Sequence, residues 1–271
     1  MTLPTISIVT ISFNQEQFLR QAIESVLSQN YQSLQYIVVD PGSKDGSREL
    51  IDSYGSRVTV RVYEPDSGPA DGLNHGFGKA SGEIMGYLNA DDILLPNVLE
   101  KVAEFFSRTP DIDVVSGSCL IIDAHGRTLR ESYSDRFRPN RVMYRAANIM
   151  QPSTFFRRDA FLRTNGFNVA NRLDWDTELF IDMHDKGAAF ATMNSMLSGF
   201  RIHETTVTAQ HRNSLFLRKE LRQLFEKKRG RAWRWYDHPI RWGYLAAKYA
   251  GNPKWISNRL LKGRVAGRSG S

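Results

Sequence analysis

The sequence predicts an α/β fold, in which a mostly parallel sheet is covered by helices and is followed by a mixed half and a helical tail. Strand-like and helix-like segments alternate four times within about the first hundred residues, the pattern of a doubly wound parallel sheet. Beyond Pro110 this alternation fades into strands and turns. From about Ser214 the segments have the composition of helices, with interruptions expected near Pro239 and Pro253.

Each element of the first half has its own signal. The β-branched segment Ile6–Phe13 predicts a buried strand. The next segment predicts a one-faced helix, because Phe18, Ala22 and Val26 recur at four-residue spacing. The same criteria predict further strands at Leu34–Asp40, Val58–Asp66 and Glu83–Asp92, and helices near Leu50–Ile51, Ala70–Ala80 and Leu95–Phe106.

The chain is expected to divide at residue 110, where the strand–helix alternation fades, and at residue 211, where the charge changes. Residues 1–110 and 111–211 are the two halves of one domain, and residues 212–271 form a tail. This tail has 16 Lys and Arg, three acidic residues and four of the five tryptophans, whereas the rest of the chain is mildly acidic. Basic and aromatic residues together suit an anionic membrane surface or a nucleic acid. The alternative is an appendage that packs its aromatic side chains on the body.

Composition excludes several classes of protein. A single cysteine, Cys119, excludes an intramolecular disulfide and a cysteine-based metal cluster. The sequence shows no signal peptide. It also shows no apolar run near the ~18 residues that a membrane-spanning helix needs. We therefore expect a soluble protein in a reducing compartment.

Polar residues follow the predicted strand ends, where an open parallel sheet binds its ligands. They occur at Ser12–Asn14, Asp40, Asp66 and Asn89–Asp92. Clustered acids predict a divalent cation shared with substrate phosphates, although Asp91 and Asp92 have the alternative of capping the next helix. The glycine motifs of dinucleotide-binding dehydrogenases and P-loop nucleoside triphosphatases are absent, which disfavours both classes.

Four segments together resemble the family 2 glycosyltransferases with the GT-A fold: SIVTISFNQEQFLRQAIESVLSQNY, YIVVDPGSKDGS, EPDSGPADGLNHGFGKASGEIMGYLNADD and LDWDTELF. The resemblance covers roughly residues 5–205. It implies a Rossmann-like GT-A domain that transfers a sugar from a nucleoside diphosphate to an acceptor, usually with inversion. Residues 1–110 would bind the nucleotide sugar, and residues 111–211 would bind the acceptor and supply the catalytic base.

The resemblance also implies individual roles. Asp40 matches the aspartate that hydrogen-bonds the base of the donor, and the donor contacts implied in full are Ser12, Phe13, Asn14, Asp40, Asp66, Asn89, Gln151 and Arg201. Asn89 stands where the family often has the first aspartate of an Asp-x-Asp motif. Mn²⁺ or Mg²⁺ would be held by Asp91, Asp92 and His203. Arg201 would supply positive charge to the leaving diphosphate.

The catalytic base implied is Asp174, with Asp176 as the second choice, and the alternative for Asp174 is a helix cap or a charge that complements the helix dipole. We expect a UDP-sugar donor and a glycan or lipid-linked acceptor of bacterial polysaccharide assembly. The enzyme would be cytoplasmic, held on the inner face of the membrane by residues 212–271, and no nucleic-acid partner is expected. Asn89 and Leu173, where many members have acids, keep open a catalytically weak scaffold that binds nucleotide sugar or glycan.

Overall fold

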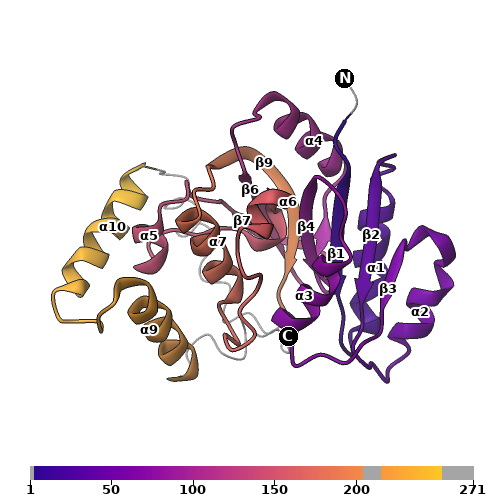
Figure 1. Cartoon of the computed structure of the whole chain (residues 1–271), viewed down its shortest axis with the longest axis horizontal. Helices are drawn as coiled ribbons and strands as arrows, with labels where there is room; N and C mark the ends of the chain where they lie inside the picture. The colour runs from indigo at the N-terminus through magenta and orange to yellow at the C-terminus, as the bar shows by residue number, and fades with distance from the viewer. Residues whose placement is uncertain (1–2, 204–214, 252–271) are drawn as a thin grey trace.

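The computed structural model describes residues 3–203 and 215–251 (Figure 1). In the first half, strands and helices alternate as predicted, and β3, β2, β1 and β4 lie side by side in parallel. The elements are β1 (Ile6–Ile11), α1 (Glu16–Leu27), β2 (Leu34–Val39), α2 (Ser47–Ser53), a 3₁₀ turn (Gly55–Arg57), β3 (Val60–Val62), α3 (Pro69–Gly78) and β4 (Ile84–Asn89). Ile11 pairs with both Val39 and Asn89, so the carboxyl ends of three strands meet at one edge of the sheet.

The second half extends the same sheet with mixed directions, as the sequence predicts. Strand β8 runs antiparallel to both β4 and β6, and β9 runs parallel to β6. After β5 (Ile93–Leu94) and α4 (Val98–Arg108), which complete the first half, the elements of the second half are β6 (Val114–Ile122), β7 (Thr128–Ser132), α5 (Pro139–Met143), a 3₁₀ turn (Gln151–Ser153), β8 (Thr154–Arg157), α6 (Arg158–Leu162), α7 (Trp175–Asp185) and β9 (Phe190–Arg201). The path of the sheet is β3-β2-β1-β4-β8-β6-β9-β5, with β7 on β6.

Helices cover both faces of this sheet (Figure 1). Successive side chains of a strand point to opposite faces, and β1 shows this directly. Ile8 packs in the core formed with α1, α2 and α4, whereas Val9 packs in the core formed with α3, α6 and α7. Because both faces are buried, the strands have continuous apolar runs, which is what made them recognisable in the sequence.

The tail contains α9 (Leu215–Arg229) and α10 (Asp237–Gly251). The break between them precedes Pro239, which lies in the first turn of α10, where the ring is tolerated. Pro253 and Trp255 lie outside the described residues. Trp233 packs against Tyr144 of the body, as the appendage alternative expects, but Trp235 and Trp242 are exposed. Within residues 3–203 and 215–251, no helix is long and apolar enough to cross a membrane.

Candidate active site

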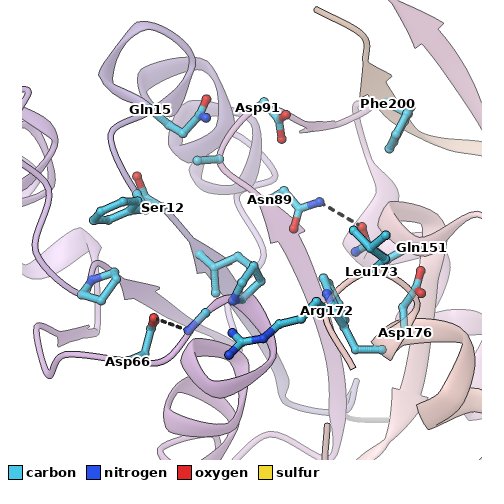
Figure 2. A pocket seen from close by; sticks show the side chains of 17 residues that line it. Ser12, Gln15, Asp66, Asn89, Asp91, Gln151, Arg172, Leu173, Asp176 and Phe200 are labelled. Carbon is cyan, nitrogen blue, oxygen red and sulfur yellow. Dashed lines mark hydrogen bonds between the residues drawn. The ribbon is translucent and has the colours of Figure 1, made fainter. Parts of the chain in front are cut away.

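A cavity of about 580 Å³ lies at the carboxyl ends of the parallel strands. Figure 2 shows the 17 side chains that line it, which come from both halves of the domain. Its charged residues are Asp66, Asp91, Arg172 and Asp176, and much of the remaining wall is apolar, with Ile11, Phe13, Pro41, Pro69, Ala90, Leu173, Trp175 and Phe200. A concave, largely apolar wall with a few polar groups is typical of a small-molecule site.

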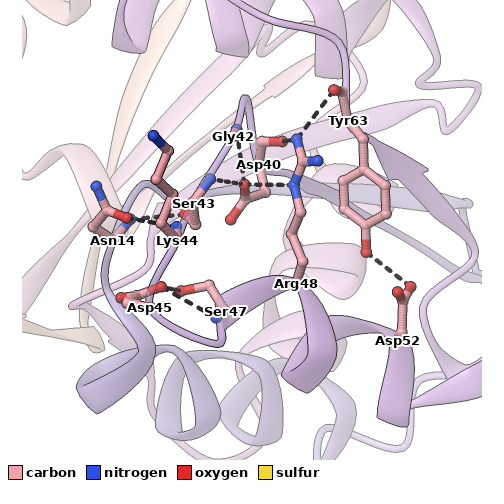
Figure 3. Close-up of polar contacts among 10 residues, drawn as sticks. All are labelled: Asn14, Asp40, Gly42, Ser43, Lys44, Asp45, Ser47, Arg48, Asp52 and Tyr63. Carbon is pink, nitrogen blue, oxygen red and sulfur yellow. Dashed lines mark hydrogen bonds and ion pairs between the residues drawn. The ribbon is translucent and has the colours of Figure 1, made fainter.

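Asp40, directly after β2, organises the loop beside this cavity (Figure 3). Its Oδ1 accepts hydrogen bonds from the backbone N–H groups of Gly42 (3.0 Å) and Ser43 (2.8 Å) and from Arg48 Nε (3.1 Å). The Arg48 side chain also donates to the carbonyl oxygens of Asp40 and Tyr63. Asp40 Oδ2 is buried and has no hydrogen-bond partner in the part of the chain described. Such an oxygen is costly, and a donor group on a ligand would satisfy it.

The loop between β1 and α1 provides the next three predicted contacts. Ser12 lines the cavity, and its buried hydroxyl has no hydrogen-bond partner among the described residues. Phe13 lines it too and is 58% exposed. Asn14 has a φ of 51°, and its Oδ1 accepts a hydrogen bond from the backbone of Lys44 while its own N–H donates to Ser43 Oγ. Asn14 does not line the cavity, so its contribution is to join the two loops.

Asp66 lines the cavity beyond β3. Its Oδ1 accepts a hydrogen bond from the Gly68 N–H (2.9 Å), and burial raises the pKa of its carboxyl group. Arg172, which the sequence interpretation missed, lines the same wall and donates to the carbonyl oxygen of Ser67. Trp175 was missed in the same way. The sequence did offer a signal for both residues, because they lie within two positions of Asp174, the predicted catalytic base.

Asn89 and Gln151 come together although 62 residues separate them. The Asn89 amide donates to Gln151 Oε1 (3.3 Å), and Gln151 Nε2 donates to the carbonyl oxygen of Tyr87 (3.1 Å). Both side chains line the cavity, on the side where β4 meets the second half (Figure 2). This contact joins the two halves at the site.

Asp91 and Asp92 have different surroundings. Asp91 lines the cavity, and its Oδ2 lies 3.1 Å from Nε2 of His203. Asp92 is 1% exposed, does not line the cavity, and accepts a hydrogen bond from the backbone N–H of Arg201 (2.9 Å). Burial and the charge of Asp91 raise the pKa of Asp92 well above its usual range. Neither aspartate caps α4, whose N-cap residue is Asn97.

No three acidic, histidine or cysteine side chains converge on a metal-sized site within the described ranges. The Asp91 carboxylate at the cavity wall and the His203 imidazole behind it lie 3.1 Å apart and are the two candidate ligands that come together. Mg²⁺ and Mn²⁺ accept such incomplete protein sets when substrate phosphates supply the other oxygens. The Asp91–His203 pair therefore fits a cation bound together with a diphosphate.

Arg201 does not have the surroundings that the sequence interpretation assigned to it. It is 1% exposed and lines neither this cavity nor the one that adjoins it. Its guanidinium group donates to the carbonyl oxygens of Asp91, Asp123 and Ala124 and to the side chain of Gln21. These bonds consume the donors that a diphosphate would need. Arg201 therefore holds the loop after β4 rather than contacting a donor.

The adjoining cavity has a volume of about 530 Å³. Four residues line both cavities and mark their boundary: Gln151, Leu173, Asp176 and Phe200. The rest of the second wall comes from β6, β7, the α5 region, α7 and α9, including Arg130, Arg145 and Leu221. The boundary is thus a place where two bound molecules would meet.

Of the two predicted catalytic aspartates, Asp176 lies at this boundary and Asp174 lies on the side of the second cavity. Asp174 lines the second cavity, and its Oδ2 lies 2.9 Å from Nη2 of Arg145. It occupies the N-cap position of α7 but makes no side-chain cap bond, and its Oδ1 accepts a hydrogen bond from the Thr177 hydroxyl. Asp176 lines both cavities, and burial together with the charge of Asp174 raises its pKa to about 6. A simple capping role therefore does not account for Asp174.

Arg145 has an unusual backbone for a non-glycine residue, with a φ of 55°. The left-handed conformation is unfavourable for residues with a Cβ and persists where the surroundings impose it, often at functional sites. Tyr144 precedes it and donates a hydrogen bond to Asp237 at the start of α10 (2.6 Å). The tail is therefore connected by contacts to the residue that pairs with Asp174.

The sequence model described as glycosyl transferase family 2 matches residues 7–164. The chain is 31% identical over 130 residues to an uncharacterized glycosyltransferase of Nostoc sp., covering 47% of this chain and 40% of that protein. It is 34% identical over 116 residues to glycosyltransferase GlyG of Streptococcus pneumoniae, covering 42% and 38%. The match thus spans less than half the length of these curated relatives.

Solved structures share the fold at low sequence identity. TarS of S. aureus, in complex with UDP-GlcNAc, superposes with a TM-score of 0.66 at 16% identity and covers 96% of this chain and 76% of that chain. The mannosyltransferase PcManGT from Pyrobaculum calidifontis, in complex with GDP-Man and Mn²⁺, gives 0.64 at 17% identity, covering 100% and 77%. The observed architecture is therefore the GT-A fold.

Proposed function

The chain belongs to glycosyl transferase family 2, and on this premise we propose that it transfers a sugar from a nucleoside diphosphate to a glycan or lipid-linked acceptor, with inversion. One observation carries the proposal. The parallel strands of the family-matched region end at a cavity whose polar residues suit a nucleotide and which lies beside the Asp91–His203 pair. A second cavity, lined by the carboxylates of Asp174 and Asp176, adjoins it. Two adjoining cavities are what a two-substrate transfer requires.

The donor proposed is a UDP-sugar. Asp40 Oδ2 would accept a hydrogen bond from the base, because it is buried without a partner among the described residues and directly precedes Pro41, which lines the cavity. Asp66 and Asn89 would contact the nucleoside and ribose, and Gln151 would contact the sugar at the boundary. TarS, which shares the fold, was crystallised with UDP-GlcNAc, whereas PcManGT was crystallised with GDP-Man. A screen of nucleotides must therefore include both bases.

Asp91 and His203 would hold Mg²⁺ or Mn²⁺ at the diphosphate. The bound cation would neutralise the charge that develops on the leaving nucleoside diphosphate. Asp92 would act indirectly, because its carboxylate anchors the backbone of Arg201 and thereby the strand end that carries His203. Exclusion of water from this partly closed cavity would strengthen each of these polar contacts.

Asp174 is the base that we propose. It lines the cavity assigned to the acceptor, where the hydroxyl proton must be removed as the oxygen attacks the anomeric carbon from the side opposite the diphosphate. Arg145 and Thr177 would hold its carboxylate in position. Asp176 is the competing candidate, because it lies on the boundary of both cavities and its pKa of about 6 leaves it ionised at neutral pH.

Two measurements test the function. A thermal-shift series with UDP, GDP, dTDP and their sugars, with Mn²⁺ or with EDTA, should give the largest stabilisation for UDP compounds with the metal. Turnover of the preferred donor should fall about 10²- to 10⁴-fold in Asp174→Asn, the range expected for loss of a general base. The isosteric Asp176→Asn is the matched comparison, and a larger loss there would reassign the base. Donor binding without any transfer or hydrolysis would instead indicate a nucleotide-sugar-binding scaffold.

The place of action that we propose is the cytoplasmic face of a bacterial membrane, in polysaccharide assembly. Residues 212–271 carry 16 Lys and Arg and three acidic residues, so the tail would be attracted to anionic lipids. Leu221 of α9 lines the second cavity, so the tail also contributes to the acceptor side. A lipid-linked acceptor would be presented on the side of the molecule where the tail lies.

A further inference from the structure

Helix α10 is amphipathic in the reverse of the usual sense. Apart from His238, the exposed residues of α10 are all uncharged. Together with Trp235, which precedes the helix, we call the following residues the α10 apolar face: Trp235, Pro239, Ile240, Trp242, Gly243, Ala246, Ala247 and Ala250. Trp235 is 81% exposed, Trp242 66% and Ile240 40%. The charged residues Asp237 and Lys248 are the ones that the helix buries. Figure 1 shows α10 at the outer end of the molecule.

The buried side of α10 fixes this orientation. Asp237 is fully buried and accepts hydrogen bonds from two nitrogens of Arg231 (2.7 Å each) and from the Tyr144 hydroxyl (2.6 Å). The bonds from Arg231 lower the pKa of Asp237. At the other end, Lys248 pairs with Asp135 at 2.9 Å. Turning the apolar face inward would separate Asp237 and Lys248 from these partners, and it would remove the partner of the buried Tyr144 hydroxyl and of the Asp135 carboxylate, which is costly. The exposure of the tryptophans is therefore built into the packing.

The surroundings of the face favour an anionic partner. Exposed basic residues of the tail include Lys219, Arg222, Arg229 and Arg234. The sequence that follows α10, residues 252–271, contains five Lys and Arg and no acidic residue. A second copy of the chain, paired about a two-fold axis, would bring these like charges together. An anionic lipid surface matches both the charge and the tryptophans, whose rings prefer the headgroup region.

The tail also connects this face to the proposed acceptor site. Tyr144, bonded to Asp237, directly precedes Arg145, whose guanidinium pairs with Asp174. Lys227 and Lys228 of α9 pair with Glu178 and Asp182 on α7, the helix that begins directly after Asp174. Tail and catalytic half are therefore joined by several ion pairs, so a membrane bound at α10 would have a defined position relative to the second cavity.

We propose that the α10 apolar face seats in the headgroup region of an anionic membrane, with Trp235 and Trp242 as its anchors. The helix lies in the plane of the membrane, and the basic residues contact lipid phosphates. This deepens the proposed function, because the second cavity is then held at the surface where a lipid-linked acceptor lies.

Flotation with vesicles tests the proposal on the full chain. Wild-type protein should float with phosphatidylcholine vesicles that contain phosphatidylglycerol and not with phosphatidylcholine alone. The double variant Trp235→Ala/Trp242→Ala should bind at least about tenfold more weakly, since binding scales with the buried apolar area. Leu162→Ala, which removes a 55% exposed side chain from α6, is the matched control and should bind like the wild type.

Three outcomes would contradict the proposal. Flotation of the double variant equal to that of the wild type would overturn it, as would equal binding to both vesicle types. A wild-type dimer that dissociates on the double substitution, measured by light scattering, would assign the face to a second copy. Nucleoside diphosphate binding in solution should be unchanged in the double variant. Weak nucleotide binding in the wild type would refute the proposed function without affecting the membrane result.

Discussion

Replacing Asp40 with asparagine tests the donor site most directly. Asparagine keeps the shape of the side chain, and its Oδ1 still accepts from the N–H groups of Gly42 and Ser43 and from Arg48. The amide nitrogen replaces Oδ2, the atom without a partner among the described residues. A ring N–H of a bound base would then meet a donor instead of a charged acceptor, while the loop itself keeps its bonds.

The expected magnitude follows from the lost bond. A hydrogen bond to a charged group contributes about 1.5–3 kcal/mol. This corresponds to an increase of about 10- to 150-fold in the Kd of the nucleotide. The folded state should change less, because the side chain of Arg48 is 34% exposed and water can solvate its unpaired charge.

Isothermal titration calorimetry with UDP and Mn²⁺ measures the effect, and a thermal melt of each variant checks folding. Asp52→Asn is the matched control, because Asp52 is 59% exposed and contacts only the outer pair Tyr63 and Arg61 among the described residues. An unchanged Kd in Asp40→Asn, with the control also unchanged, would refute the role of Oδ2. Equal weakening in both variants would show that loop charge, not the specific oxygen, controls binding.

Three further predictions concern the walls of the site. Gly72→Ala should weaken UDP binding in the same titration, because the added Cβ would lie 2.5 Å from Oδ2 of Asp66; Gly78→Ala, with nothing within 4 Å, should have no effect. Arg201→Lys should lower the free energy of unfolding by at least about 2 kcal/mol in a urea titration, since one ammonium group cannot replace the guanidinium bonds, and an unchanged midpoint would contradict this. Finally, the pH profile distinguishes the two candidate bases. With Asp176 as the base, kcat/KM falls as the pH drops through about 6, because the raised pKa of Asp176 means that its carboxylate is protonated below that value; a flat profile down to pH about 5 would exclude Asp176 and support Asp174.

Much of the first half was predictable because its signals are local. Strands β1, β2 and β4 are apolar on both faces, and α1 buries one row of side chains, so each element is visible within a short window. The two-residue strand β5 was missed, since so short a segment has no periodicity. The 12-residue strand β9 pairs with β6, about 75 residues earlier, and such long-range pairing leaves no local trace.

The charged residues of the site likewise include features that the sequence could predict and features that depend on long-range contacts. The sequence interpretation assigned both Asp91 and Asp92 to one metal site, but the structure turns Asp91 to the cavity beside His203 and Asp92 to the backbone of Arg201. It also showed Arg201 as an available cation, whereas its guanidinium is enclosed by backbone carbonyl groups from distant loops. The direction of a side chain depends on partners far along the chain, and these partners are known only once the chain is folded.

The sequence by itself determined the α/β class, the order of the first elements and the family, because these follow from local apolar patterns and from spaced motifs. It also determined that the tail is basic and rich in tryptophan. Only the tertiary structure decided which face of α10 is buried, through the pairing of Asp237 with Arg231 and of Lys248 with Asp135. Burying a charge is favourable only with a partner in place, so the folded contacts, not the composition, direct Trp235 and Trp242 outward.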